Sequence, residues 1–249
     1  MSVFETEAVV LKHYPLSESS RIAVFFTREH GKLRAVAEGI KKPKNPLAGA
    51  LEPFNHVRVW LWFREGKDLG QVRNAEIVGS FPGKSPDLRR IFTCSYFAEI
   101  TNEIVQENQP NDALFRLLMA SMKACTNGLP TAALIRYFEI WALRINGFLP
   151  NFNRCAVCGK GVVEEGFFAW IESGEARCRS CSGGTGLWMS TKSVSAIEKM
   201  MKLSPEEFMI LPFNPTVMLE LEKFSQRLLS FNLERQLKSW PFLREALHS

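Results

Sequence analysis

Two closely spaced cysteine pairs constrain this chain more than any other feature of its sequence. Cys155 and Cys158 form one C-x-x-C pair, and after nineteen intervening residues Cys178 and Cys181 form a second. Each pair brings two thiolates within reach of one ion, and four sulfurs satisfy the tetrahedral preference of Zn²⁺. The spacing therefore predicts one structural zinc ion in a closed site, because four thiolates leave no position for water or substrate.

The segment between the cysteine pairs fits the hairpin of a zinc ribbon. Residues 167–171 form an apolar, strand-like run, and residues 172–175 have the composition of a turn. The alternative is a thiol redox protein in which the two pairs act as dithiols, but no thioredoxin-like βαβ pattern surrounds either pair. Cys94 and Cys125 lie in helical runs and are interpreted as small buried hydrophobic residues.

Length and composition favour a soluble globular protein without a membrane segment. The chain has 249 residues, of which 46% are hydrophobic and 23% charged. No stretch approaches the roughly 18 consecutive apolar residues of a membrane-spanning helix, and the first residues do not resemble a secretion signal. We therefore expect a cytoplasmic location, where disulfides are rare.

The first eighty residues predict a small β-barrel. Short apolar or alternating runs, typical of strands, cover residues 8–11, 21–27, 32–37, 56–64 and 69–78. A loop rich in Pro and Gly interrupts them between residues 39 and 53. Five strands with one long interruption favour an OB-type barrel, and an SH3-like barrel fits the pattern nearly as well.

After the barrel the hydrophobic period becomes helical. Ser85 is the expected N-cap of a first helix, which ends near residue 106; two further helices cover about 111–127 and 131–146, and helical pattern resumes after residue 190. The sequence thus predicts an α+β multidomain protein, with an OB domain and an α-helical domain that carries the four-cysteine insert. The expected segments are 1–80 for the OB domain, 81–150 and 188–249 for the helical domain, and 151–187 for the zinc-ribbon insert.

Positive charge is concentrated near the second and third predicted strands. The net charge of the chain is +5, and residues 28–44 alone contribute six basic and two acidic side chains. Lys41, Lys42 and Lys44 lie in a proline-bounded loop, where they can reach phosphate without disturbing a sheet. A lysine-rich loop is usually only a solvated surface, but beside an OB-type barrel it indicates nucleic-acid binding.

The predicted strand at residues 56–64 adds an aromatic face. Its odd-numbered residues should point into the barrel, which leaves Arg58, Trp60, Trp62 and Arg64 on the outer side. Bases of single-stranded nucleic acid stack on aromatic rings while cations follow the backbone. The alternative interpretation is that the following helices cover both tryptophans.

Catalytic motifs are missing from the sequence. The four histidines form neither H-E-x-x-H nor H-x-E, and no G-x-S-x-G or dinucleotide-binding motif occurs. The sequence therefore predicts a protein that is not an enzyme. Besides nucleic-acid binding, a protein-interaction module built from the barrel and ribbon stays open.

Several sequence stretches together resemble the RecO family of bacterial DNA repair proteins. They include the segments at residues 9–12, 14–21, 37–44, 51–54, 147–150 before the first cysteine pair, and 235–239. The resemblance implies an OB domain joined to a helical domain with a zinc site.

The same resemblance implies a function in recombinational repair through the RecF pathway. It implies binding to single- and double-stranded DNA, annealing of complementary strands, and, with RecR, loading of RecA onto strands coated by single-strand-binding protein. RecF would be an indirect partner, and the location would be nucleoid-associated. By position, the implied DNA contacts are Arg21, Lys32, Arg34, Lys41, Lys42 and Lys44.

Overall fold

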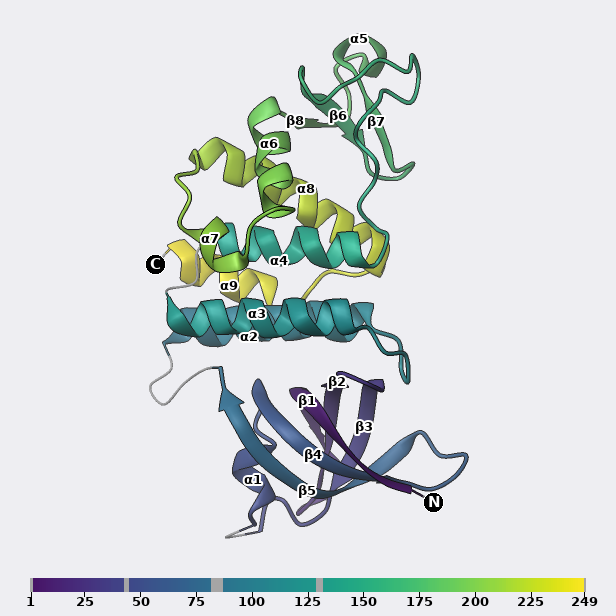
Figure 1. The fold of residues 1–249 in the computed structure, drawn as a ribbon, viewed down its shortest axis with the longest axis vertical. Helices are drawn as coiled ribbons and strands as arrows, with labels where there is room; N and C mark the ends of the chain where they lie inside the picture. Colours follow the sequence, from purple (N-terminus) through teal and green to yellow (C-terminus); the bar gives the residue numbers. More distant parts are fainter. Residues whose placement is uncertain (1, 43–44, 82–86, 129–131, 249) are drawn as a thin grey trace. The chain divides into compact units, whose positions relative to one another are not determined.

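The computed structural model describes residues 2–42, 45–81, 87–128 and 132–248 (Figure 1). The chain forms two compact units: the barrel unit, Met1–Leu129 with Ser239–Ser249, and the ribbon unit, Pro130–Lys238. The polypeptide therefore leaves the barrel unit once and returns to it at its C-terminus. Two of the helices expected in segment 81–150 belong to the barrel unit and the third to the ribbon unit, and the domain boundaries drawn from the sequence stay a prediction.

The barrel is closed and has the strand order of an OB fold. Its strands pair in the order β1-β2-β3-β5-β4, with β1 also paired to β4, and β3–β5 is the parallel pair. A short helix, α1 (Leu47–Ala50), lies between β3 and β4 in the chain. The OB-type barrel expected from the sequence is thereby confirmed. The strand bounds are β1 Ser2–Pro15, β2 Arg21–Thr27, β3 Gly31–Ala37, β4 Asn55–Phe63 and β5 Leu69–Ser80.

Period-two alternation fills the barrel interior as the sequence indicated. On β4, the side chains of Val57, Val59 and Leu61 are fully buried, whereas Arg58 between them is exposed. The inward residues of all five strands join one apolar cluster, which also includes Ile40. Burial of apolar surface at about 25 cal/mol per Å² is what holds such a barrel closed.

Three helices complete the barrel unit: α2 (Leu88–Ile104), α3 (Asp112–Asn127) and α9 (Trp240–His248). Phe26 lies on the outer side of β2 but is fully buried, because its ring meets Phe115 of α3 edge-on at 5.6 Å. Helix α2 packs against β1 and α3 (Figure 1). The helices therefore cover part of the outer surface of the barrel.

Helix α9 packs on α2 through aromatic rings. The ring centroids of Trp240 and Tyr96 are 5.4 Å apart, and those of Phe242 and Phe92 are 6.1 Å apart. Glu99 of α2 also accepts a hydrogen bond of 2.8 Å from the backbone N–H of Ser239. The C-terminal residues are thus part of the hydrophobic packing of the barrel unit.

The N-cap of α2 differs from the residue expected from the sequence. The helix begins at Leu88, and the carboxylate of Asp87 caps it by accepting a 2.6 Å hydrogen bond from the N–H of Arg89. Ser85, the expected cap, lies outside the described residues.

The ribbon unit contains a helical part and a small sheet. The helices α4 (Ala132–Ile145) and α8 (Pro215–Leu233) pack against each other, and α6 (Thr191–Met200) and α7 (Pro205–Met209) contact α4. The sheet has the order β7-β6-β8; a short turn joins β6 to β7, whereas α5 lies between β7 and β8 in the chain. Its elements are β6 Phe167–Trp170, β7 Glu175–Arg177, β8 Leu187–Met189 and the short helix α5 Arg179–Ser182.

A buried ion pair within α4 is hydrogen-bonded to α8. Arg136 and Glu139 are almost completely buried, and their side chains approach to 3.0 Å. Glu139 also accepts hydrogen bonds from Ser225 at 2.5 Å and from Gln226 at 2.7 Å, both on α8. Removal of one partner of a buried pair typically costs about 3–5 kcal/mol, because it leaves an uncompensated buried charge.

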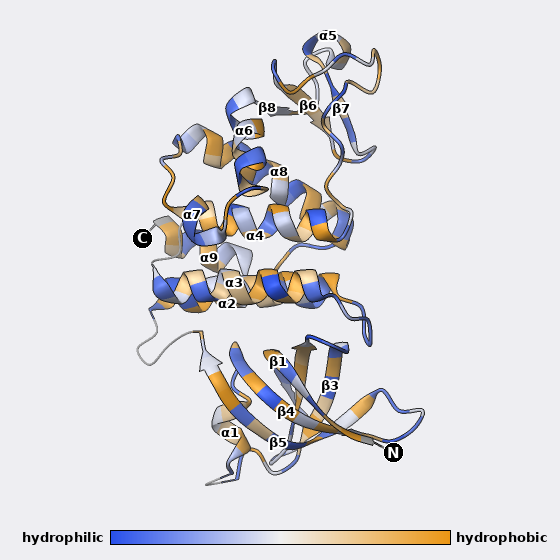
Figure 2. Cartoon of the chain, viewed as in Figure 1, coloured by the Kyte–Doolittle hydropathy of each residue, from blue (hydrophilic) through white to orange (hydrophobic). Residues whose placement is uncertain are grey.

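Hydropathy varies along every large helix. Helices α3, α4 and α8 carry hydrophilic and hydrophobic stretches in alternation (Figure 2). Within the described ranges, no helix combines the length and apolar character needed to cross a membrane.

Substitution of Gly31 tests the close contact between the β2–β3 turn and the α2–α3 connection. It has φ +71°, and a Cβ there would lie 2.1 Å from the carbonyl oxygen of Gln109 in the α2–α3 connection. Gly66 has φ +72° with open space around it. We expect Gly66→Ala to cost about 1 kcal/mol of unfolding free energy, from backbone strain alone, and Gly31→Ala about 2–4 kcal/mol. Urea unfolding of the full chain measures both, and equal losses would contradict the close packing.

Candidate metal centre and nucleic-acid interface

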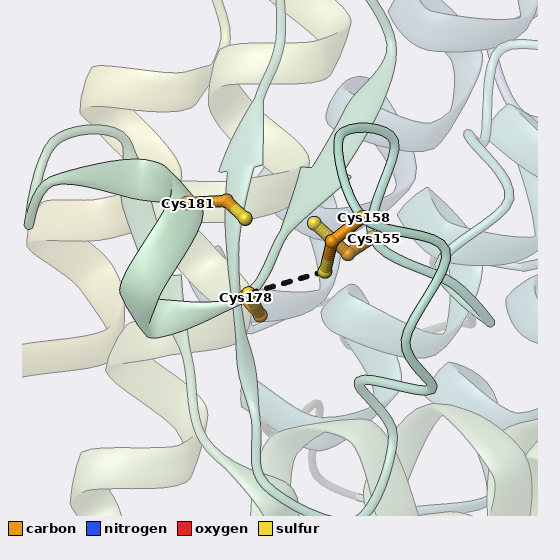
Figure 3. A group of neighbouring side chains, drawn as sticks. All are labelled: Cys155, Cys158, Cys178 and Cys181. Atoms are coloured by element: carbon orange, nitrogen blue, oxygen red, sulfur yellow. Dashed lines mark hydrogen bonds between the residues drawn. The ribbon is translucent and has the colours of Figure 1, made fainter.

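The four cysteines of the two pairs converge on one point. Their Sγ atoms all lie within 4.8 Å of one another, and those of Cys158 and Cys178 are 3.8 Å apart (Figure 3). Four sulfurs bound at 2.3 Å around a tetrahedral ion would be separated by about 3.8 Å. The predicted ligand set is therefore brought together with the dimensions of a metal site.

Tight backbone turns position each pair. In the first, the N–H of Gly159 donates to the carbonyl of Cys155 at 2.9 Å, and Gly159 has φ +72°. In the second, Cys178 precedes α5, and the N–H of Cys181 donates to its carbonyl at 3.1 Å. The hairpin between the pairs is β6 and β7, and its turn covers residues 171–174, one residue earlier than the turn expected at 172–175.

The protonation of the thiols fits a cation site. Burial acts to raise the pKa of Cys155, but N–H groups of Cys178, Cys158 and Val157 outweigh it and lower that pKa to about 6. Hydrogen bonds with Cys178 and Cys158, together with burial, raise the pKa of Cys181 to about 12. The cluster thus favours the thiolate form of Cys155 and disfavours deprotonation of Cys181. A divalent cation would neutralise the negative charge of the thiolates. The donor set could hold a metal ion without an open coordination position.

Cys94 and Cys125 lie elsewhere, in α2 and α3. Both are fully buried, as the sequence predicted. A hydrogen bond to Cys125, together with burial, raises the pKa of the Cys94 thiol well above its usual value. The Cys94 thiol therefore stays neutral, and both residues pack as small hydrophobic side chains.

The structure divides the predicted DNA contacts into two groups. The first group is engaged within the barrel unit. Lys32 donates a 2.8 Å hydrogen bond to the carbonyl of Asn102, and burial lowers the pKa of Lys32. Arg34 forms an ion pair with Glu107 at 2.9 Å, and Arg58 forms one with Glu5 at 3.2 Å.

Arg21 belongs to the same group. Its guanidinium lies 3.3 Å from the ring of His13 and 3.7 Å from the carboxylate of Glu52. The four cations of this group therefore already have partners in the folded chain.

The second group lies on open surface. Lys41 and Lys42 are exposed after β3, and Lys41 donates a hydrogen bond to the carbonyl of Ser17. Trp60 is half-buried on the outer side of β4, and Arg64 is exposed just beyond the strand. Within the described ranges, neither Lys42 nor Arg64 forms an ion pair. Lys44 lies outside the described residues.

Arg73 was missed by the sequence analysis. Its guanidinium lies over the ring of Trp62, 5.1 Å from the centroid, and its side chain is exposed. The β4–β5 pairing skips Arg73 between the pairs Trp60–Asn74 and Leu61–Val72, which marks a β-bulge. A bulge turns an extra side chain onto one face, and period-two patterning cannot locate it.

The chain combines an OB-type barrel, a helical region and a ribbon with four clustered cysteines, which defines it as a multidomain OB-fold protein. Comparison with known proteins matches the barrel strands and the rest of the chain to two family models. Residues 1–81 match the family model described as Recombination protein O N terminal, and residues 85–241 match Recombination protein O C terminal.

Several relatives of similar length are DNA repair proteins named RecO. The chain is 30% identical to the DNA repair protein RecO of Koribacter versatilis over 94% of its own length and 95% of that protein. It is 32% identical to the DNA repair protein RecO of Anaeromyxobacter sp. strain K, over 95% and 94%. Identity to that of Geobacter metallireducens is 31%, over 98% of both chains. The chain belongs to the RecO family of DNA repair proteins.

The metal site gives a prediction with an internal control. We expect one tightly held metal ion per purified chain by elemental analysis. The double variant Cys155→Ser/Cys178→Ser should hold almost none, because two of four ligands are lost. Cys94→Ala/Cys125→Ala should keep one ion. Full metal content in the first variant would contradict the site.

Proposed function

We propose that this chain is a DNA-binding mediator of recombinational repair that performs no catalysis of its own. It binds single- and double-stranded DNA, anneals complementary strands and, with RecR, assists RecA onto strands coated by single-strand-binding protein, with RecF an indirect partner. It acts in the cytoplasm at the nucleoid. The observation that carries the proposal is the family match, which covers both the barrel and the region with the cysteines.

Exposed cations of the barrel unit support binding to phosphate. Lys41 and Lys42 follow β3, and neither is held in an ion pair with a described residue. Cations that neutralise phosphates release counterions from the DNA, so the affinity of such a surface falls steeply with salt. The loop that carries them is therefore where we expect sequence-independent contacts.

We further propose that the four-cysteine site holds one Zn²⁺ ion with a structural role. The ribbon has a small core in which Val162 and Phe167 are fully buried, beside Cys155. A segment of this size buries little apolar surface, so metal binding supplies much of its folding free energy. The cysteines hold the ribbon together and take no part in a reaction.

The lysine loop gives a direct test by fluorescence anisotropy with a labelled oligonucleotide. Lys41→Ala/Lys42→Ala/Lys44→Ala should weaken binding and reduce the slope of log affinity against log salt, by up to about 0.9 for each lost phosphate contact. The control Lys123→Ala/Lys192→Ala/Lys199→Ala removes the same charge from exposed positions elsewhere. Equal affinity of the wild type and the loop variant would exclude the loop from DNA binding.

The mediator function needs a separate assay. Complementary strands are coated with single-strand-binding protein, and annealing is followed by fluorescence quenching with and without RecR. We expect the chain to accelerate annealing of the coated strands. A chain that binds no oligonucleotide in dilute buffer, and does not promote annealing, would instead be a protein-interaction module.

A further inference from the structure

The β2–β3 face, which OB barrels generally use for nucleic acids together with the neighbouring loops, is largely covered here. Val24 and Phe26 point outward from β2 but are 2% and 0% exposed. Phe26 packs on Phe115 of α3, and Lys32 of β3 is bonded to the carbonyl of Asn102 at the end of α2. A strand of DNA would need a different face of this barrel.

The outer face of β4 offers that surface. Trp60 and Trp62 are alternate residues on the central strand of a three-stranded antiparallel stretch. Trp60 lies opposite Glu5 of β1 and Asn74 of β5, and Trp62 lies opposite Val3 and Gln71. Both rings are half-buried, so each presents part of its surface to solvent.

Charge on this face is uneven along the strand. Arg58, at one end, forms an ion pair with Glu5 and lies opposite Glu76 of β5. At the other end Arg73 lies over Trp62. Arg64, Lys67 and Arg73 form no ion pair with any described residue, and together with the exposed Glu65 and Asp68 they give the end that carries Trp62 a net charge of +1.

We propose that the outer face of β4 and β5 around Trp60, Trp62 and Arg73 stacks unpaired bases, so that the barrel binds single-stranded DNA here. The proposal rests on the DNA-binding function proposed above. Every base has a π-face, so stacking on indole is tolerant of sequence, and Arg adds a cation–π contribution. Bases in a duplex are already stacked on one another, so the two indoles select single strands.

This face is continuous with the lysine loop. Gln71, opposite Trp62, donates a 3.2 Å hydrogen bond to Glu38, the first residue after β3. Lys41 and Lys42 follow three and four residues later in the same loop. A single strand can therefore place bases on the tryptophans and its phosphates near the lysines.

The test compares the affinity of the full chain for a labelled dT oligonucleotide and for a duplex of equal length, at several salt concentrations. In the variant Trp60→Ala/Trp62→Ala, the loss of each ring should lower the affinity for the single strand by about tenfold or more. The affinity for the duplex should change little. Its salt slope should stay unchanged, because no phosphate contact is removed. Trp60→Phe/Trp62→Phe should retain most of the binding, which separates stacking from a loss of folding.

A matched pair of charge variants locates the face. Arg73→Gln should weaken binding of the single strand and reduce the slope of log affinity against log salt by the amount expected for about one phosphate contact. Arg34→Gln should change the affinity for the single strand less than twofold. Unchanged binding by the alanine variant, or a larger loss with Arg34→Gln, would overturn this inference while leaving DNA binding intact. A wild-type chain that binds no DNA would overturn the proposed function itself.

Discussion

The contact between the β2–β3 turn and the α2–α3 connection decides much of what the barrel unit can present to solvent. Backbone approaches backbone so closely at Gly31 and Gln109 that no side chain fits at position 31. The N–H of Asn108 donates to the carbonyl of Lys32 at 3.1 Å, and Asn108 itself has φ +58°, a conformation that Asn tolerates better than most residues. This contact holds the helices on one side of the barrel and leaves β4 and β5 as open surface.

The same contact gives several cations of the basic run at residues 28–44 partners within the folded chain. Arg28 forms an ion pair with Asp112, Arg34 with Glu107, and the ammonium group of Lys32 is bonded to a backbone carbonyl. Exposed ion pairs contribute little stability, commonly below about 1 kcal/mol, but each cancels a charge that DNA would otherwise meet. The cationic surface is therefore smaller than the sequence suggests, and it shifts toward the loop after β3 and the end of β4.

The parts of the structure that follow from local pattern were predictable. Alternation at Val57, Val59 and Leu61 located the inner face of the barrel, and the spacing of the cysteines located the metal site. Features that depend on distant partners were not predictable. No residue near Lys32 in the sequence indicates its hydrogen bond to Asn102. The bulge that brings Arg73 onto Trp62 produces no periodic pattern in the sequence. The packing of Trp240 likewise could not be predicted, because its partner Tyr96 lies far away along the chain.

The ribbon unit is an insertion in the chain of the barrel unit, since α9 returns to pack on α2. A fragment that ends after α3 would consequently separate α2 from Trp240 and Leu243, and would leave an apolar face of α2 open to aggregation. A fragment that keeps the whole barrel unit needs Ser239–Ser249 joined back to Met1–Leu129. Substitutions in α9 therefore affect the stability of the unit that the first part of the chain forms.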